Sequence, residues 1–254
     1  MRFKRILLII LSGIITNLYA VSAQAIPTLQ LDIGGGTYDF TTETIVSSGE
    51  VFTLYAFLIP NSYNQLSDTY YISAVVSPMI GEPGANLGSF SFNGDVIDVT
   101  AEMTYGIAPL EGIISSQGWD KGDLPKHGMF PTYFSEFGFS FSAGNQINKY
   151  NTQDRAISDG PIDLDYESSG GMYYTAFSID TSLLDPNYII HFDLYNTKLI
   201  TGTGDIDITQ FAPFSHDAES CHNCASVPEA STVLLLGAGF AGLWIFKRLI
   251  MVIT

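Results

Sequence analysis

The feature that most constrains the fold is the alternation of apolar and polar residues with a period of two. In residues 133–142 (YFSEFGFSFS) four aromatic residues share odd positions, whereas Glu136, Ser140 and Ser142 share even positions; the four are Tyr133, Phe137, Phe139 and Phe141. Successive side chains of a β-strand point to opposite faces, so this pattern predicts a half-buried strand. The predicted inward faces are Leu29, Leu31 and Ile33; Tyr70, Ile72, Ala74 and Val76; Tyr133, Phe137, Phe139 and Phe141; Tyr173, Thr175, Phe177 and Ile179; Ile190, Phe192 and Leu194.

Strands without intervening helices define the fold class. They exclude a parallel α/β architecture and predict an all-β domain over residues 26–214, an antiparallel β-sandwich of the jelly-roll or immunoglobulin-like type. Residues 51–60 (VFTLYAFLIP) are apolar on both faces, which predicts a strand covered on both sides. Asn93-Gly94 separates two alternating runs and predicts a type I′ hairpin.

Two segments lack the alternation. Residues 145–171 are rich in Asn, Asp, Ser and Gly and predict a long surface loop. Residues 215–226 follow the last alternating run and predict a linker. The sequence therefore indicates one domain, one linker and a C-terminal segment, 227–254.

The N-terminal 25 residues have the composition of a signal peptide. A basic region with Arg2, Lys4 and Arg5 precedes an apolar stretch over residues 6–15, a predicted signal helix. Ala23-Gln24-Ala25 then places small residues at the two positions that signal peptidase reads. We expect cleavage after Ala25 and export of the mature chain.

The charge of the body limits its partners. Residues 26–233 contain all 26 Asp and Glu but only five Lys and Arg, so the formal charge is 5 − 26 = −21. Such a surface repels the phosphates of nucleic acids and anionic lipids. We therefore expect no nucleic-acid partner; the same charge keeps an exported protein soluble.

The C-terminal segment has the composition of a membrane anchor. Residues 233–246 are apolar or small, Lys247 and Arg248 follow, and residues 249–253 are apolar again. A transmembrane helix needs about 20 such residues, a length reached when the two basic side chains extend toward the membrane surface. Basic residues favour the cytoplasmic side, which places the body outside.

The same segment resembles the PEP-CTERM sorting signal. Val227-Pro228-Glu229 is followed by a Gly-rich apolar stretch and then by the basic pair Lys247-Arg248, with Ala230 where the motif usually has Pro. The resemblance implies that the tail is held in the inner membrane until an exosortase recognises and removes it. It also implies a bacterium that makes exopolysaccharide, and delivery to the cell surface or extracellular matrix.

The body resembles the choice-of-anchor N proteins. The similar stretches are IPTLQLDI, TLYAFL, LGSFSFNG, LPKHGMFPTYFSEFGFSFS, TSLLDPNYIIHFDLYNTK and GDIDITQFAPFSHDAES. In that family one exported domain is joined to alternative C-terminal anchors. The resemblance implies no known activity and supplies no catalytic residues.

Cys221 and Cys224 are the two cysteines of the chain. Their spacing suits a local disulfide, a redox motif or half of a zinc site. A redox motif should open a helix beside a parallel sheet, and a zinc site would need two neighbouring ligands such as His216 and His222. We favour the disulfide, because export places the pair in an oxidising compartment.

Acidic residues suggest one metal site. Asp163, Asp165 and Glu167 fall on one side of an extended segment, and clustered oxygen ligands suit Ca²⁺. The alternative is a solvated acidic face, and we favour it over the calcium site because a body with this many carboxylates shows such alternation by chance. No cofactor other than this calcium is expected. On another predicted strand His191 and Asp193 share the polar face, which predicts a surface pair.

These observations predict an exported structural or adhesive protein of the cell surface or exopolysaccharide matrix, without enzymatic activity. No nucleophile elbow, phosphate-binding loop or metalloprotease motif is present in the sequence. The first alternative is a carbohydrate-binding module that uses the aromatic strands. The second is a hydrolase that uses two carboxylates.

Overall fold

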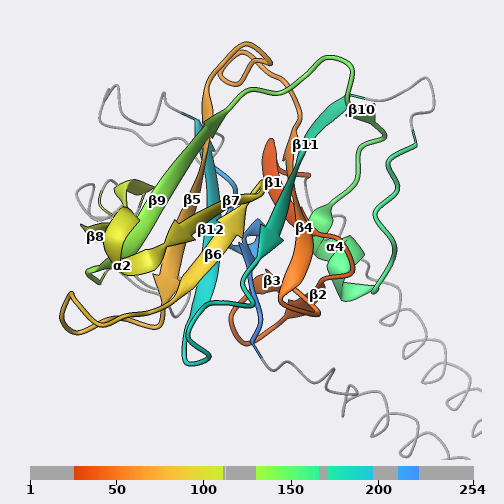
Figure 1. Ribbon diagram of the computed structural model, residues 1–254. Coiled ribbons are helices and arrows are strands. Elements are labelled where there is room, and N and C mark those ends of the chain that lie inside the picture. Colours follow the sequence, from red (N-terminus) through yellow and green to blue (C-terminus); the bar gives the residue numbers. More distant parts are fainter. Residues whose placement is uncertain (1–25, 111, 113–129, 166–170, 197–210, 223–254) are drawn as a thin grey trace, which may run out of the picture.

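Alternating strands build two sheets that pack face to face, which confirms the predicted β-sandwich (Figure 1). The computed structural model describes residues 26–110, 112, 130–165, 171–196 and 211–222. The predicted signal helix (1–25) and the predicted transmembrane helix within 227–254 lie outside these residues. In the described part of the chain, no helix combines the length and the apolar character needed to cross a membrane.

The first sheet has the strand order β1-β4-β11-β6-β7, and β10 pairs with β11. All its pairs are antiparallel. Its strands are β1 (Leu29–Ile33), β4 (Val51–Leu58), β6 (Ser89–Phe92), β7 (Asp95–Asp98), β10 (Gln146–Ile147) and β11 (Met172–Asp180).

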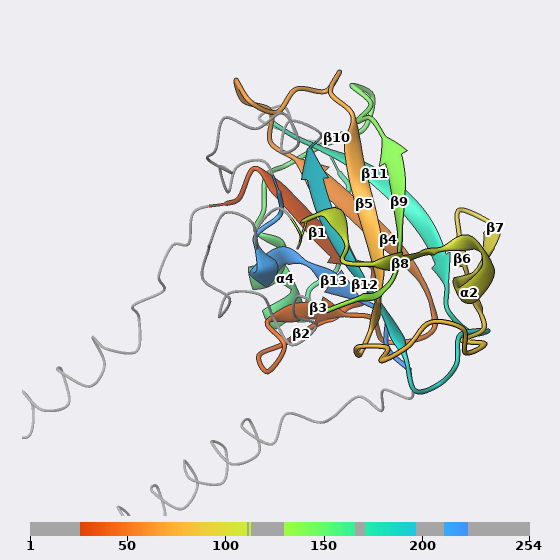
Figure 2. The same ribbon diagram turned by 90° about the vertical axis from the view of Figure 1, so that its left-hand side faces the viewer.

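The second sheet has the order β2-β3-β13-β12-β5-β9-β8 (Figure 2). Its pairs are antiparallel except the parallel pair of β13 with β3. Its strands are β2 (Thr37–Asp39), β3 (Thr44–Val46), β5 (Tyr70–Ser77), β8 (Thr104–Gly106), β9 (Thr132–Phe139), β12 (Ile189–Asn196) and β13 (Ala218–Glu219). The short helices are α2 (Val99–Glu102), α4 (Thr152–Ile157) and the 3₁₀ helix η3 (Phe214–His216).

The core lies between the sheets and contains or contacts the predicted inward residues except Thr175, which is half-buried and outside it. Aromatic rings join the sheets: Phe92 of β6 stacks on Phe137 of β9 with centroids 3.9 Å apart, and Phe177 of β11 meets Phe139 of β9 edge to face at 5.1 Å. Burial of each large apolar side chain contributes about 1.5–3 kcal/mol. The row Tyr133, Phe137, Phe139 and Phe141 therefore lies in or against the core, which removes it as an exposed platform for sugar rings.

Residues 145–162 do not form the predicted surface loop: β10 extends the first sheet, and residues 148–162 form a third layer outside it. This layer includes α4, which lies beside β1 and β2 (Figure 1). Ile147 and Tyr150 pack with Phe57, whose side chain points away from the main core. This layer explains why β4 is apolar on both faces, as the sequence predicts for a strand covered on both sides.

Residues 215–222 belong to the domain, whereas the sequence predicts the start of a linker there. β13 inserts between β12 and β3, and Asp217 and Ala218 are completely buried. Ser220 joins the same ladder through hydrogen bonds to Ile190 in both directions. The alternation Asp217-Ala218-Glu219 covers too few residues to be recognised as a strand from sequence alone.

Two glycines with positive φ hold the turns around β6. Asn93 and Gly94 have φ of 54° and 88°, which confirms the predicted I′ hairpin between β6 and β7. Gly88 has φ of 78° and forms a bridge with Leu184. A Cβ at Gly88 would lie 2.1 Å from the Leu183 carbonyl oxygen, whereas one at Gly94 would meet nothing within 4 Å.

The two glycines give a matched test. We expect Gly94→Ala to lower the free energy of unfolding by about 1–2 kcal/mol, because alanine disfavours the left-handed conformation. Gly88→Ala should cost at least about 3 kcal/mol, because it adds a clash with backbone to the same conformational penalty. Urea unfolding of the purified proteins measures both. Equal losses for the two variants would contradict the bridge at Gly88.

Candidate functional site

A group of polar side chains lies on the outer face of the second sheet. His191 and Asp193 alternate with core residues along β12 and so point away from the sandwich interior. The register pairs His191 with Glu219 of β13, and this places Asp217 beside Asp193. Two adjacent strands thus gather one imidazole and three carboxylates, which we call the histidine–carboxylate cluster.

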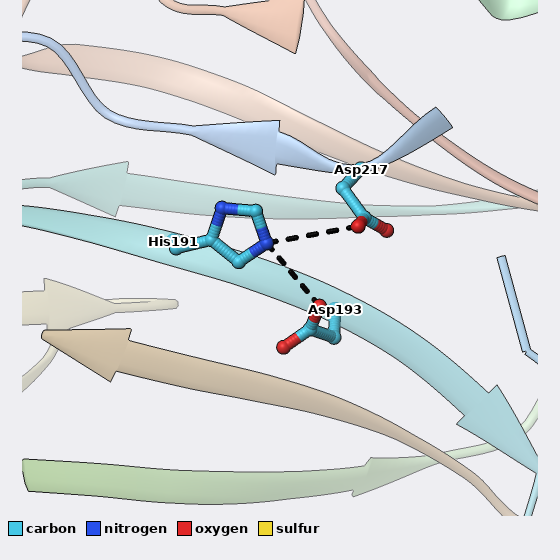
Figure 3. A group of neighbouring side chains, drawn as sticks. All are labelled: His191, Asp193 and Asp217. Atoms are coloured by element: carbon cyan, nitrogen blue, oxygen red, sulfur yellow. Dashed lines mark hydrogen bonds and ion pairs between the residues drawn. The ribbon is translucent and has the colours of Figure 1, made fainter. Parts of the chain in front are cut away.

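The atoms of the cluster converge on the imidazole (Figure 3). His191 Nε2 lies 3.2 Å from Asp193 Oδ1 and 3.7 Å from Asp217 Oδ2. On the other side of the ring, Nδ1 lies 3.9 Å from Glu219 Oε2. His191, Asp193 and Asp217 have at most 1% of their surface exposed. The predicted surface pair of His191 and Asp193 is therefore wrong, because alternation gives the face of a side chain but not what covers that face.

Buried carboxylates dominate the electrostatics of the cluster. Burial alone would lower the pKa of His191, but Asp193, Asp217 and Glu219 outweigh it and raise this pKa well above its ordinary value of 6.5. The imidazole is therefore a cation at neutral pH. One imidazole faces three carboxyl groups within these four side chains. His191 and Asp217 also take part in further interactions.

Two oxygen atoms at the cluster make no hydrogen bond. Asp193 Oδ2 is one, and Ser73 Oγ is the other. Ser73 pairs directly with Asp193 across β5 and β12, so both side chains point from the same face. Both residues are almost completely buried. Unpartnered buried oxygens are rare because each lost hydrogen bond costs about 1–3 kcal/mol.

A buried ion pair fixes α4 to the outer face of the first sheet. The Arg155 guanidinium binds both carboxylate oxygens of Asp32 in β1 and donates to the Gly36 carbonyl at 2.8 Å. Asp32 also accepts the Ile33 N–H and the Tyr150 hydroxyl. Burial raises the pKa of Asp32 to about 6, and Arg155 limits the rise, so Asp32 is ionised at neutral pH.

The N-terminus of α4 is held from two sides. Gln30 of β1 accepts the Thr152 N–H at 3.0 Å, and the Asn151 side chain caps the helix by accepting the Asp154 N–H. Asn151 also bonds to His216 Nε2 at 3.1 Å. Burial lowers the pKa of His216 to about 4, so its ring is neutral at physiological pH. Because Asn151 Oδ1 can only accept, this bond requires the ring proton on Nε2. These bonds connect the third layer to both sheets.

A pocket of about 440 Å³ lies beside this helix. Asn148, Lys149, Asp154 and Asp163 are among its lining residues. The side-chain oxygen of Asn148 is itself buried and makes no hydrogen bond to the described residues. A concave site lined by amide and charged groups suits a polar ligand.

The predicted calcium residues are only partly described. Asp163 and Asp165 are exposed, and the Asp165 N–H donates to Asp163 Oδ1 at 2.9 Å. Glu167 lies outside the described residues, so this calcium site stays a prediction. Within the described ranges, the group of metal-binding side chains that lie close enough to share one ion is His191, Asp193 and Asp217, with ligand atoms within 4.8 Å of one another.

The remaining predicted sites lie at the two ends. Cys221 is buried and disulfide-bonded, and the chain has one other cysteine, Cys224, beyond the described residues. Other predicted site residues also lie outside the described part: the cleavage residues Ala23 and Ala25, the motif Val227, Pro228 and Glu229, and the basic pair Lys247 and Arg248.

Sequence reasoning missed Asp217, Glu219 and the pair of Asp32 with Arg155. Asp217 and Glu219 were hidden in the predicted linker. A signal for the ion pair was present: Arg155 is one of only five basic residues in a body with 26 acidic ones. A lone Arg in such a context is a candidate partner for a buried carboxylate.

Comparison with known families identifies the C-terminal tail. Residues 226–248 match the PEP-CTERM protein-sorting motif, which confirms the predicted resemblance of the tail. The protein is therefore exported, sorted to the cell surface through its C-terminus and processed by an exosortase. No match is found among curated proteins or solved structures.

The ion pair generates a stability prediction. Arg155→Met leaves the Asp32 carboxylate buried without its cation, and we expect a loss of about 3–5 kcal/mol in the free energy of unfolding. The double variant Asp32→Asn/Arg155→Met should recover part of this loss, because neither charge remains. Lys149→Met is the matched control; Lys149 lines the same pocket but is exposed, so the change should stay within about 0.5 kcal/mol. Equal effects of Arg155→Met and Lys149→Met in urea unfolding would contradict the assignment.

Proposed function

We propose that this protein is a non-catalytic structural or adhesive component of the cell surface or exopolysaccharide matrix. In this proposal the C-terminal tail holds the newly exported chain in the inner membrane, and exosortase processing passes the sandwich to the exterior. The carrying observation is the sorting motif at residues 226–248, joined to a folded acidic β-domain. We also propose that the domain is of the choice-of-anchor N type.

The charge and the core support an extracellular, soluble role for the domain. A formal charge of 5 − 26 = −21 over residues 26–233 favours repulsion from anionic lipid and mutual repulsion between copies. Neutral or basic polysaccharide and dissolved cations are compatible partners for such a surface. The tail, and not the domain, then accounts for contact with the membrane.

The proposal assigns no catalysis to the described residues. His191 resembles a general base held by carboxylates, but its side chain has no exposed surface through which a substrate could reach it. The described pocket is lined by other residues. A buried cluster of this kind suits a structural role.

Deletion of residues 227–254 tests the proposal. The full chain should fractionate with membranes and cell surface, whereas the truncated chain should appear in the medium or periplasm. Changing Val227, Pro228 and Glu229 to Ala is the matched variant: it keeps the apolar stretch and should leave the unprocessed protein in the membrane. Equal surface association with and without the tail would overturn the proposal.

The pocket beside α4 favours carbohydrate binding as a second candidate function. Asn148, Asp154 and Asp163 offer amide and carboxylate groups that can bind sugar hydroxyls. The concave shape of the pocket, together with these polar lining groups, is the specific observation that favours it. The aromatic row of Tyr133, Phe137, Phe139 and Phe141 does not contribute, since its rings pack in or against the core.

Measuring the binding of the protein to the exopolysaccharide of the bacterium that produces it tests this candidate function. Asn148→Ala and Asp163→Asn should each weaken binding by roughly tenfold, equivalent to about 1.4 kcal/mol. Asp95→Asn, an exposed change on β7, should have no effect. Unchanged binding in all three variants would exclude the pocket. Release of new sugar ends in the same mixture would instead favour the carboxylate hydrolase.

A further inference from the structure

We propose that His191, Asp193 and Asp217 bind one divalent first-row transition-metal ion, such as Zn²⁺ or Mn²⁺, on the outer face of the second sheet (Figure 3). The site is separate from the acidic segment at Asp163 and Asp165, and it goes beyond the proposed function.

The positions of the three ligand atoms support this site. His191 Nε2 lies 3.2 Å from one carboxylate oxygen and 3.7 Å from the other, and the three offered atoms lie within 4.8 Å of one another. Ligands bound at about 2.0–2.2 Å from a tetrahedral or octahedral ion are themselves about 3–4.4 Å apart. Small side-chain rotations therefore bring the three atoms onto one ion.

The unpartnered oxygens point independently to a ligand. Asp193 Oδ2 and Ser73 Oγ are buried and make no hydrogen bond. Ser73 lies directly opposite Asp193, so its hydroxyl faces the same region as the carboxylate. An ion at the cluster would give Asp193 a second interaction, and an ion-bound water could accept or donate a hydrogen bond at Ser73.

The charge of the cluster also favours a cation. Asp193, Asp217 and Glu219 place three carboxylates on adjacent strands in a region with little or no solvent contact. Isolated buried charge is expensive unless it is paired or coordinates a metal. A divalent ion that replaces the Nε2 proton of His191 supplies two positive charges instead of one at the point where two of these carboxylates meet.

The donor set selects the class of ion. Imidazole nitrogen suits Zn²⁺ and similar ions, while carboxylates alone suit Ca²⁺ and Mg²⁺. Glu219 completes the arrangement, because its carboxylate lies on the Nδ1 side of His191, 3.9 Å away. Metal-bound histidines commonly donate the other ring N–H to a carboxylate, which fixes the ring orientation. We assign Glu219 as a positioning residue.

Metal titration of the full exported chain tests the inference. After dialysis against chelator, calorimetry with Zn²⁺, Mn²⁺ and Ca²⁺ should give one transition-metal ion per chain and weaker or no binding of Ca²⁺ at this site. Asp193→Asn should weaken the transition metal at least about 100-fold. Asp163→Asn removes an exposed carboxylate elsewhere and is the matched control, with unchanged affinity.

A second variant keeps the test valid if Asp193→Asn does not fold. Ser73→Ala removes an unpartnered buried hydroxyl, so it should leave the metal-free melting temperature unchanged or higher, yet lower the affinity about tenfold. Chelator should lower the melting temperature of the metal-loaded parent but not that of Asp193→Asn. Absence of transition-metal binding by the parent, equal affinity in Asp193→Asn, or preference for Ca²⁺ at the cluster would each overturn the proposal.

Discussion

Contact between the inner faces of the two sheets is the interaction on which the rest of the structure depends. Phe92 on Phe137 and Phe177 against Phe139 fix the spacing and register of the sheets. With its apolar residues committed to this interior, each strand presents its alternate residues on an outer face. The polar chemistry of the domain therefore depends on the side chains of each outer face and on the segments that pack over that face.

The two outer faces bury charge in different ways. On the first sheet, Asp32 meets a guanidinium that binds both its oxygens, and neighbouring groups complete its hydrogen bonds. On the second sheet, His191 lies within 4 Å of three carboxylates, and Asp193 Oδ2 makes no hydrogen bond. In the first arrangement, the described residues supply the charge and the hydrogen bonds that the Asp32 carboxylate needs, which indicates a structural role. In the second arrangement one carboxylate oxygen of Asp193 lacks a hydrogen bond, so this cluster is the better candidate for a ligand-binding site.

Strand faces could be predicted from the sequence because a period of two is a local property. The inward residues from Leu29 to Leu194, the hairpin at Asn93-Gly94 and the double coverage of β4 all followed from such patterns. The third layer and β13 could not be predicted, since their short elements are stabilised by contacts distant in sequence: Arg155 with Asp32, and Asp217 with His191. The histidine–carboxylate cluster depends on the pairing of β12 with β13. The sequence pattern therefore indicated only the two members on β12, His191 and Asp193.

The position of β13 has a mechanical consequence. It is the last described strand before the sorting tail, and it lies inside the second sheet, with β12 on one side and β3 on the other. Tension applied through an anchored C-terminus would thus reach an internal ladder rather than a free edge. Asp217 and Glu219 lie at or beside this strand. Stronger interactions between these residues and His191 would therefore also raise the force needed to pull β13 out of the sheet.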